Sequence, residues 1–371
     1  MQKTNQTLPL SLLMAATTLM APQAMAQQAG NGQLTVGVSH STLYGSTADI
    51  SLSGEDIAGS GVDLDLEHRL GDEGQGSRAS ITKTWDLGQS ALGADSWAAI
   101  EVNGALSDWD IRPYSESHIG LELQFGAALG QNLSWQGSLF WQRDELDDLD
   151  SGISSIIAAD SGESEVAGLT LGLHWDSARG RSARGRELLQ PGTSAALGGK
   201  LSVAQQGRRD SRHLYASFET TQALAGRTVW RLSASGGAVR GTGDDGYVHI
   251  LDRAFLGGKA PRGFASGSAG PRDTSTGDAL GGTKYLTGSA EVLTPGWRED
   301  VALGVFYDFG STWDLPGISG VDDSRHWRSS VGVSGHWRSR YGDLSLSWAA
   351  PINSQDIDEE QRLSLSLNAR F

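Results

Sequence analysis

The segment KAPRGFASGSAGP, residues 259 to 271, sets a single arginine, Arg262, among glycines and a proline. It shows neither helical nor strand periodicity, so we predict a loop. Two interpretations stay open. Arg262 is either a solvated residue on a connector or a guanidinium that bridges carboxylates on nearby strands through short, charge-assisted hydrogen bonds. The elements around the loop decide between them.

Other sequence patterns that could indicate a catalytic, cofactor or metal site are weaker evidence. GTGDDG (241–246) matches GxGxxG but precedes no helical pattern, which a dinucleotide site requires. The acidic run DELDDLDSG (144–152) is interpreted as a solvated charge cluster, with weak binding of a divalent cation as the alternative. The eight histidines form no HExxH motif, and no GxSxG elbow occurs. We therefore expect no catalytic residue, no metal and no cofactor.

The first 26 residues have the features of a secretory signal peptide. Lys3 provides a positive charge, residues 8–20 form a short apolar run, and Ala24-Met25-Ala26 is a small-x-small cleavage site. The apolar run is shorter than the ~20 residues of a membrane-spanning helix. We expect residues 1–26 to be removed on export and residues 27–371 to form one domain.

Composition narrows the class of protein. The chain contains no cysteine, which excludes disulfides and thiolate metal sites. A formal net charge of −15 argues against nucleic acid as a partner. Fifty glycines and 12 tryptophans suit a turn-rich, all-β chain. The same composition fits an outer-membrane barrel as well as a soluble protein.

Alternation of apolar and polar residues recurs along the chain and predicts about sixteen strands. An even number is what single-chain bacterial barrels have. The expected strands lie near residues 33–39, 47–54, 61–69, 77–86, 95–104, 117–129, 133–144, 165–176, 193–205, 212–223, 227–240, 279–294, 300–313, 326–339, 342–351 and 361–371.

One strand favours a membrane barrel over a soluble sandwich. In HWRSSVGVSGHWRS (326–339), Trp327 and Trp337 share one face and lie ten residues apart. That separation is about 33 Å along a strand. With a tilt of ~40° it becomes roughly 25 Å, the height of the lipid-facing band between two aromatic girdles. We predict a transmembrane antiparallel β-barrel in outer-membrane lipid, with Trp327 and Trp337 in its girdles.

The connections alternate between short and long. Short periplasmic turns and long outer loops would have this pattern. The connection at 177–192 is the exception, because it is long and basic yet falls on the short-turn side. It is either a tolerated insertion or a basic patch for a periplasmic partner or anionic lipid. The longest connection, 241–278, contains Arg262, and we expect it to fold into the lumen as a plug loop.

Strand alternation also nominates partners for Arg262. In KYLTGSAEVLTP (284–295) the apolar positions direct Glu291 to the opposite, inward face. In VALGVFYDFGSTW (301–313) the same argument directs Asp308 inward. We expect Arg262 to bridge these two lumen carboxylates.

The segment DRAFLGGKAPRGFASGSAGP resembles the plug-loop motif of the bacterial surface antigen family, which includes the BamA, TamA and two-partner-secretion barrels. AEVLTP (290–295), GVFYDFGSTW (304–313) and the carboxy-terminal alternation of Leu363, Leu365, Leu367 and Phe371 resemble the same family, in the right order. The resemblance implies that Arg262, Gly263 and Phe264 anchor the plug loop. It also implies that the carboxy-terminal residues form a barrel signal.

Two departures from the family pattern bear on function. About six residues separate Ala26 from the first expected strand, so we expect a short member without periplasmic receiving domains. The expected last strand, 361–371, contains no glycine that would ease opening of the barrel seam. The resemblance implies a non-enzymatic protein-assembly or translocation barrel that works with periplasmic partners or client barrels, or has a derived scaffold role. A passive pore is the alternative, and an outer-membrane hydrolase is a distant one.

Overall fold

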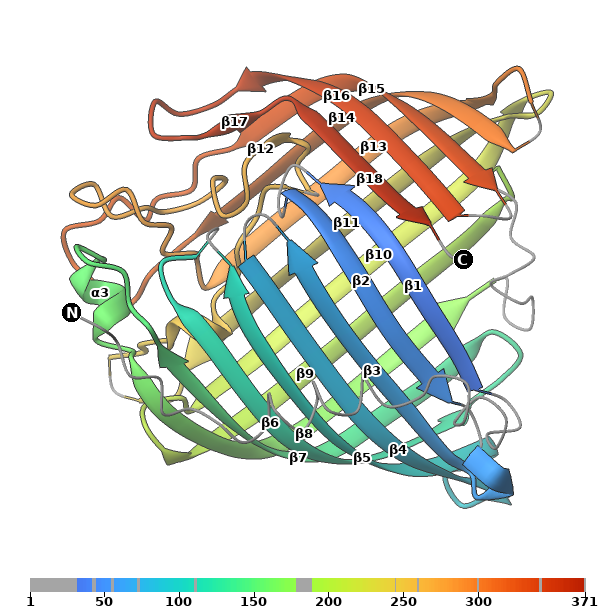
Figure 1. Cartoon of the computed structure of the whole chain (residues 1–371), viewed down its shortest axis with the longest axis horizontal. Coiled ribbons are helices and arrows are strands. Elements are labelled where there is room, and N and C mark those ends of the chain that lie inside the picture. The colour runs from blue at the N-terminus through green and yellow to red at the C-terminus, as the bar shows by residue number, and fades with distance from the viewer. Residues whose placement is uncertain are drawn as a thin grey trace.

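The computed structural model describes residues 32–41, 45–54, 57–71, 74–109, 112–177, 189–243, 245–258, 260–298, 300–339 and 342–369. Within them, sixteen strands form one antiparallel sheet in chain order, and Figure 1 shows this sheet curved into a barrel of tilted strands. The predicted all-β barrel is confirmed. The strands are β1 (Gly32–Ser41), β2 (Gly45–Gly54), β3 (Val62–Gly71), β4 (Gly74–Ser90), β5 (Gly93–Trp109), β6 (Ser115–Ala128), β7 (Leu133–Asp147), β8 (Gly162–Asp176), β9 (Gly192–Gln206), β10 (Ser211–Ala225), β11 (Thr228–Gly241), β13 (Lys284–Pro295), β14 (Val301–Trp313), β15 (Arg328–Ser339), β16 (Gly342–Asn353) and β18 (Leu363–Ala369).

The strands whose side chains the structure describes present one apolar and one polar face, because successive side chains alternate across a pleated sheet. On β14, Val305 and Tyr307 are exposed, whereas Phe306 and Asp308 are buried. The exposed apolar side chains form the outer surface of the barrel, as in proteins that contact lipid. Among the described residues no helix is both long and apolar enough to cross a membrane.

The long connections gather at one end of the barrel (Figure 1). They join β7 to β8 through the short helix α3 (Ser155–Ala158), β11 to β13 through the 3-10 helix η3 (Ile250–Asp252), and β14 to β15. Short turns, such as those joining β6 to β7 and β10 to β11, lie at the opposite end. In bacterial barrels the long loops face outward from the cell, so we call the long-loop end the outer end. Of the basic connection 177–192, residues 178–188 lie outside the described residues.

The long loops share a hydrophobic core of their own, which we call the loop cap. It combines side chains from four connections at the outer end. Burial of this apolar surface holds the connections against one another. Its buried members are Tyr114, Leu146, Ile157, Ile250, Leu280 and Leu315.

The loop cap also moves one predicted boundary. A strand was expected from residue 279, but β13 begins at Lys284. Leu280 is fully buried in the loop cap, and Gly281 has a φ of 66°, which ends the extended backbone. The long loop therefore runs from 242 to 283. It also contains the two-residue strand β12 (Gly263–Phe264), which pairs with β17 (Glu360–Gln361) of the connection after β16.

The first and last strands of the sheet, β1 and β18, lie beside each other. The strand order is linear from β1 to β18, and within the described residues no ladder joins these two strands. β18 pairs with β16, placing Leu363 opposite Trp348, Leu365 opposite Leu346 and Leu367 opposite Leu344. Phe371 and residues 1–26 lie outside the described residues.

Candidate functional site

Two neighbouring strands, β13 and β14, build an acidic patch on the inner wall of the barrel. Their register sets Ser289 opposite Asp308 and Glu291 opposite Phe306. All four side chains therefore lie on the same face of the pleated sheet. Asp308 is 2% exposed and Glu291 6% exposed. Buried carboxylates of this kind require a partner.

Arg262, from the long loop 242–283, lies on this patch. Its Nε and Nη2 atoms donate to the two oxygens of Asp308 at 2.7 and 2.9 Å, a bidentate pair. Its Nη1 atom lies 3.4 Å from Oε1 of Glu291, and Nη2 also donates to Ser289 at 3.2 Å. The backbone N–H of Arg262 donates to Asp308 as well, at 3.1 Å. The arginine thus binds side chains of both strands.

The two residues after Arg262 bring the loop backbone close to the wall. Gly263 has a φ of 96°, and a Cβ there would lie 3.2 Å from the Ala349 methyl and 3.3 Å from Cβ of Ser330. Glycine is thus favoured both by conformation and by space. Phe264 is fully buried. Ser330 of β15 donates to the carbonyl oxygen of Arg262 at 2.6 Å, which ties the loop to a third strand.

Glu291 has a wider set of partners than Arg262 alone. It accepts a hydrogen bond from Ser334 at 2.6 Å. Arg231 on β11 and His336 on β15 approach its carboxylate oxygens at 3.8 Å each. Nε2 of His336 is buried, and within the described residues no hydrogen bond reaches it. Glu291 is therefore a shared contact of the long loop and two wall strands.

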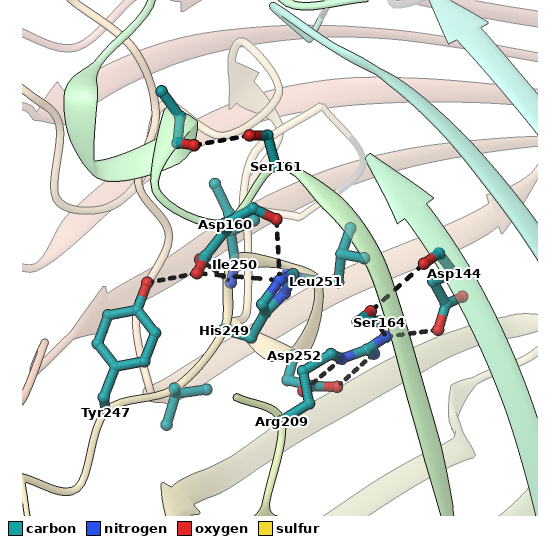
Figure 2. Close-up of polar contacts among 12 residues, drawn as sticks. Asp144, Asp160, Ser161, Ser164, Arg209, Tyr247, His249, Ile250, Leu251 and Asp252 are labelled. Atoms are coloured by element: carbon teal, nitrogen blue, oxygen red, sulfur yellow. Dashed lines mark hydrogen bonds and ion pairs between the residues drawn. The ribbon is translucent and has the colours of Figure 1, made fainter. Parts of the chain in front are cut away.

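A second polar cluster joins the outer loops to one another (Figure 2). Arg209, in the turn between β9 and β10, is 3% exposed and lies between two carboxylates. It donates to Asp252 of η3 at 3.0 and 3.1 Å and forms a short ion pair with Asp144 of β7. It also donates to Ser164 at 3.1 Å. This one guanidinium links the long loop to the β7–β8 region.

Asp160, just after α3, binds the long loop at several points (Figure 2). Its carboxylate accepts from the Tyr247 hydroxyl at 2.6 Å and from the Ile250 N–H at 2.8 Å. Its backbone carbonyl accepts from Nε2 of His249 at 3.1 Å, while Nδ1 of His249 accepts from the Leu251 N–H at 3.3 Å. Burial lowers the pKa of His249, and burial beside Asp160 raises the pKa of Tyr247. Both side chains are therefore neutral at pH 7.

Comparison with known families adds to this description of an antiparallel barrel in which Arg262 of a long loop binds Asp308 and Glu291 of the wall. The Omp85 superfamily domain matches residues 30–371. The chain belongs to the Omp85 superfamily. It is thus an outer-membrane barrel, and the predicted family resemblance and localisation are confirmed.

Relatives of this Omp85 barrel include two proteins named outer membrane protein assembly factor BamA. The one from Nitratidesulfovibrio vulgaris is 24% identical over 333 residues, which is 88% of this chain and 40% of the relative. The one from Neorickettsia risticii is 35% identical over 134 residues, which is 33% of this chain and 17% of the relative. The chain thus spans less than half the length of either factor.

Solved structures share the fold. BamA from Haemophilus ducreyi, crystallised without its POTRA domains 1–3, has a TM-score of 0.76 at 19% identity and covers 92% of this chain and 70% of that one. CdiB from Escherichia coli has a TM-score of 0.58 at 12% identity, covering 92% and 63% of the two chains.

The predicted aromatic residues lie at opposite ends of β15. Trp337 is 41% exposed, and its indole donates to Asp300 at 2.8 Å, near the short turns. Trp327 directly precedes β15 at the outer end. It packs edge-on against Phe309, with 5.8 Å between the two ring centroids. The role of the two tryptophans as girdles stays a prediction.

The acidic run 144–152 is interpreted from the sequence as a solvated charge cluster, but its first residue, Asp144, is buried. Asp144 is 3% exposed, because Arg209 and His118 bind its carboxylate. No group of three or more acidic or histidine side chains suited to a metal occurs among the described residues. Sequence reasoning missed Arg209, Asp160 and Phe306. Only Phe306 carried a signal, because alternation places it on the inner face beside Asp308.

Proposed function

We propose that this Omp85 barrel assists the assembly or translocation of other outer-membrane proteins, together with periplasmic partners or as a scaffold derived from that role. In this proposal the loop 242–283 is a plug, and Arg262, Gly263 and Phe264 are its anchor. The observation that carries the proposal is the bidentate contact of Arg262 with Asp308, extended to Glu291. The relatives named as assembly factors support the functional class.

The energetics favour a persistent plug over a loop that only rests on the wall. The Arg262 side chain is 17% exposed and both of its acidic partners are below 10%. Removing one partner of a buried charge pair leaves the other unpaired, which is strongly unfavourable. In this proposal, a loop bound in this way closes the lumen at the level of Asp308. A passive pore, the alternative function, would require an open path at that level.

Depletion of the protein, followed by quantitative proteomics of the outer membrane, tests the assembly role. We expect a selective loss of other barrel proteins, restored by the wild-type chain. Arg262→Ala should restore less than Arg272→Ala, since Arg272 belongs to the same loop but pairs with Glu359, which is 65% exposed. Unchanged barrel levels after depletion would contradict the assembly role.

Planar-bilayer recording separates the plug from the passive pore. The intact chain should show a low conductance that rises in Arg262→Ala and not in Arg272→Ala. A large and steady conductance of the intact chain would instead support the passive pore. The two experiments are independent, because one measures client proteins and the other the lumen.

A further inference from the structure

Two arginines oppose each other on the outer surface of the barrel, at its outer end. Arg212 of β10 and Arg240 of β11 are direct partners in the register of these strands. Both are exposed and lie on the strand faces that carry Leu214 and Leu232, the lipid-facing side. Like charges directly opposite on neighbouring strands repel each other. This pair therefore requires an explanation.

Within the described part of the chain, no counter-charge explains the pair. Among the residues that the structure describes, neither Arg212 nor Arg240 forms an ion pair or a hydrogen bond through its side chain. The outward positions of the flanking strands β9 and β13 carry apolar, glycine, threonine, glutamine and lysine residues, with no carboxylate. Lys284, at the outer end of β13, adds a further cation that is shared with Asp314 at 3.0 Å.

Arg143 provides the contrast. It lies on the outward face of β7, also at the outer end, opposite Glu165 in the register with β8. Its guanidinium lies 3.3 Å from Glu165 and 3.5 Å from Glu163. An outward arginine at this end can thus be neutralised by the chain itself. For Arg212 and Arg240 the described residues provide no such carboxylate, so we infer that another molecule neutralises their charges.

The height of the pair identifies that molecule. Arg212 is two residues, about 7 Å, from Leu214 along the strand, and Leu214 is 61% exposed on the lipid-facing side. The arginines therefore stand where the apolar band ends and the lipid headgroups begin. Guanidinium groups bind phosphate oxygens in a bidentate manner, and basic clusters at this level recruit anionic lipids.

We propose that Arg212 and Arg240, flanked by Lys284, form a binding site for the phosphate-bearing headgroup of an outer-leaflet lipid. One phosphate between the two guanidinium groups removes their mutual repulsion and accepts hydrogen bonds from donors that have no partner among the described residues. The site would hold an annular lipid against β10 and β11. These two strands lie away from the β1–β18 seam in the strand order of the sheet. It goes beyond the proposed assembly role and does not depend on it.

Native mass spectrometry of the full chain in detergent tests the proposal. Anionic diphosphoryl lipid A is the probe, and zwitterionic phosphatidylcholine, in which a choline offsets the single phosphate, is the reference without net charge. The wild type should retain lipid A in preference to phosphatidylcholine. Arg212→Gln combined with Arg240→Gln should weaken lipid A binding by about fivefold for each arginine removed. Phosphatidylcholine binding should stay unchanged, and heat-modifiable gel migration should verify that the variant is folded.

Arg143→Gln is the matched control, because it removes an outward arginine at the same end whose charge the chain already neutralises. It should retain lipid A as the wild type does. Equal retention by the double variant and the wild type would overturn the site, as would an equal loss in Arg143→Gln. Displacement of lipid A by millimolar inorganic phosphate alone would also overturn the assignment to a lipid.

Discussion

The guanidinium carbon of Arg262 lies 3.4 Å from the centre of the Phe306 ring. Phe306 is 5% exposed and stands on β14 two residues before Asp308, on the same inner face. One strand therefore supplies both a ring for the guanidinium to rest on and a carboxylate for its edge. A cation over an aromatic ring gains about 2 kcal/mol or more when both are desolvated. The anchor of the loop is thus partly aromatic.

Phe306→Leu tests the aromatic contribution, because leucine keeps an apolar side chain and removes the ring. We expect a loss of about 1–2 kcal/mol in the free energy of unfolding, of which the cation–π contact is one part and packing the other. Denaturant titration of the refolded barrel in lipid vesicles measures it. In an Arg262→Ala background, Phe306→Leu should lower the free energy of unfolding by less. An equal loss in both backgrounds would show that the cation–π contact does not contribute to stability.

Arg262→Ala should destabilise the loop by up to about 3–5 kcal/mol, the cost of leaving buried charges unpaired. Proteolysis within 242–283 should accelerate accordingly. Arg262→Lys should recover only part of the loss, because an ammonium cannot form the planar pair with Asp308. A double-mutant cycle with Asp308→Ala should give a coupling energy well above the ~0.5 kcal/mol of independent sites. Additive effects would mean that the two residues do not interact.

The positions of Asp308 and Glu291 on the inner wall follow from the sequence, because a pleated strand alternates its side chains with a period of two. The same rule gives the sixteen strands and the short-turn end. It fails in the loops, which have no period. The ion pairs of Arg209 with Asp144 and Asp252 join three separate connections or strand ends, and only the folded backbone brings them together.

The two faces of one strand should respond differently to charge. Ala216 on β10 faces outward, and its neighbour Ser217 faces the lumen. Ala216→Arg should lower the free energy of unfolding by about 2–4 kcal/mol if it lies near the bilayer midplane. Ser217→Arg should cost much less, because the lumen face is polar. Equal losses in vesicle unfolding experiments would show that the faces were assigned wrongly.

Substitutions on the lumen face of β15 would not serve as such a control, because two of its residues are tightly packed. Strand alternation alone does not reveal this packing. Ser330 donates to the carbonyl oxygen of Arg262, so a substitution there would disturb the anchor. A Cβ at Gly332 would clash with the carbonyl oxygen of Trp348 and with the Phe306 ring. Polar or small residues on an inner wall can therefore be as tightly packed as a core.

His249 should make the loop cap sensitive to acid. Burial holds its pKa below the ordinary 6.5, and the opposing attraction of Asp160 does not overcome that effect. The ring is bound as a neutral tautomer, since Nδ1 accepts from the Leu251 N–H. A proton on Nδ1 would place two donors against each other. The closed cap therefore excludes a proton that the opened loop would accept.

The sign of the pH effect follows from this linkage. Below pH 6.5 the opened loop binds a proton and the closed loop does not, so opening becomes easier by up to about 1.4 kcal/mol per pH unit until the lowered pKa is reached. Proteinase K nicking of 242–283 should therefore increase from pH 7.5 to pH 5.5. His249→Gln keeps an N–H donor and cannot titrate, so its nicking rate should vary less with pH. His326→Gln, at a half-buried position outside the loop cap, is the control. If the wild type and His249→Gln showed the same ratio of rates at the two pH values, His249 would not be the titrating group.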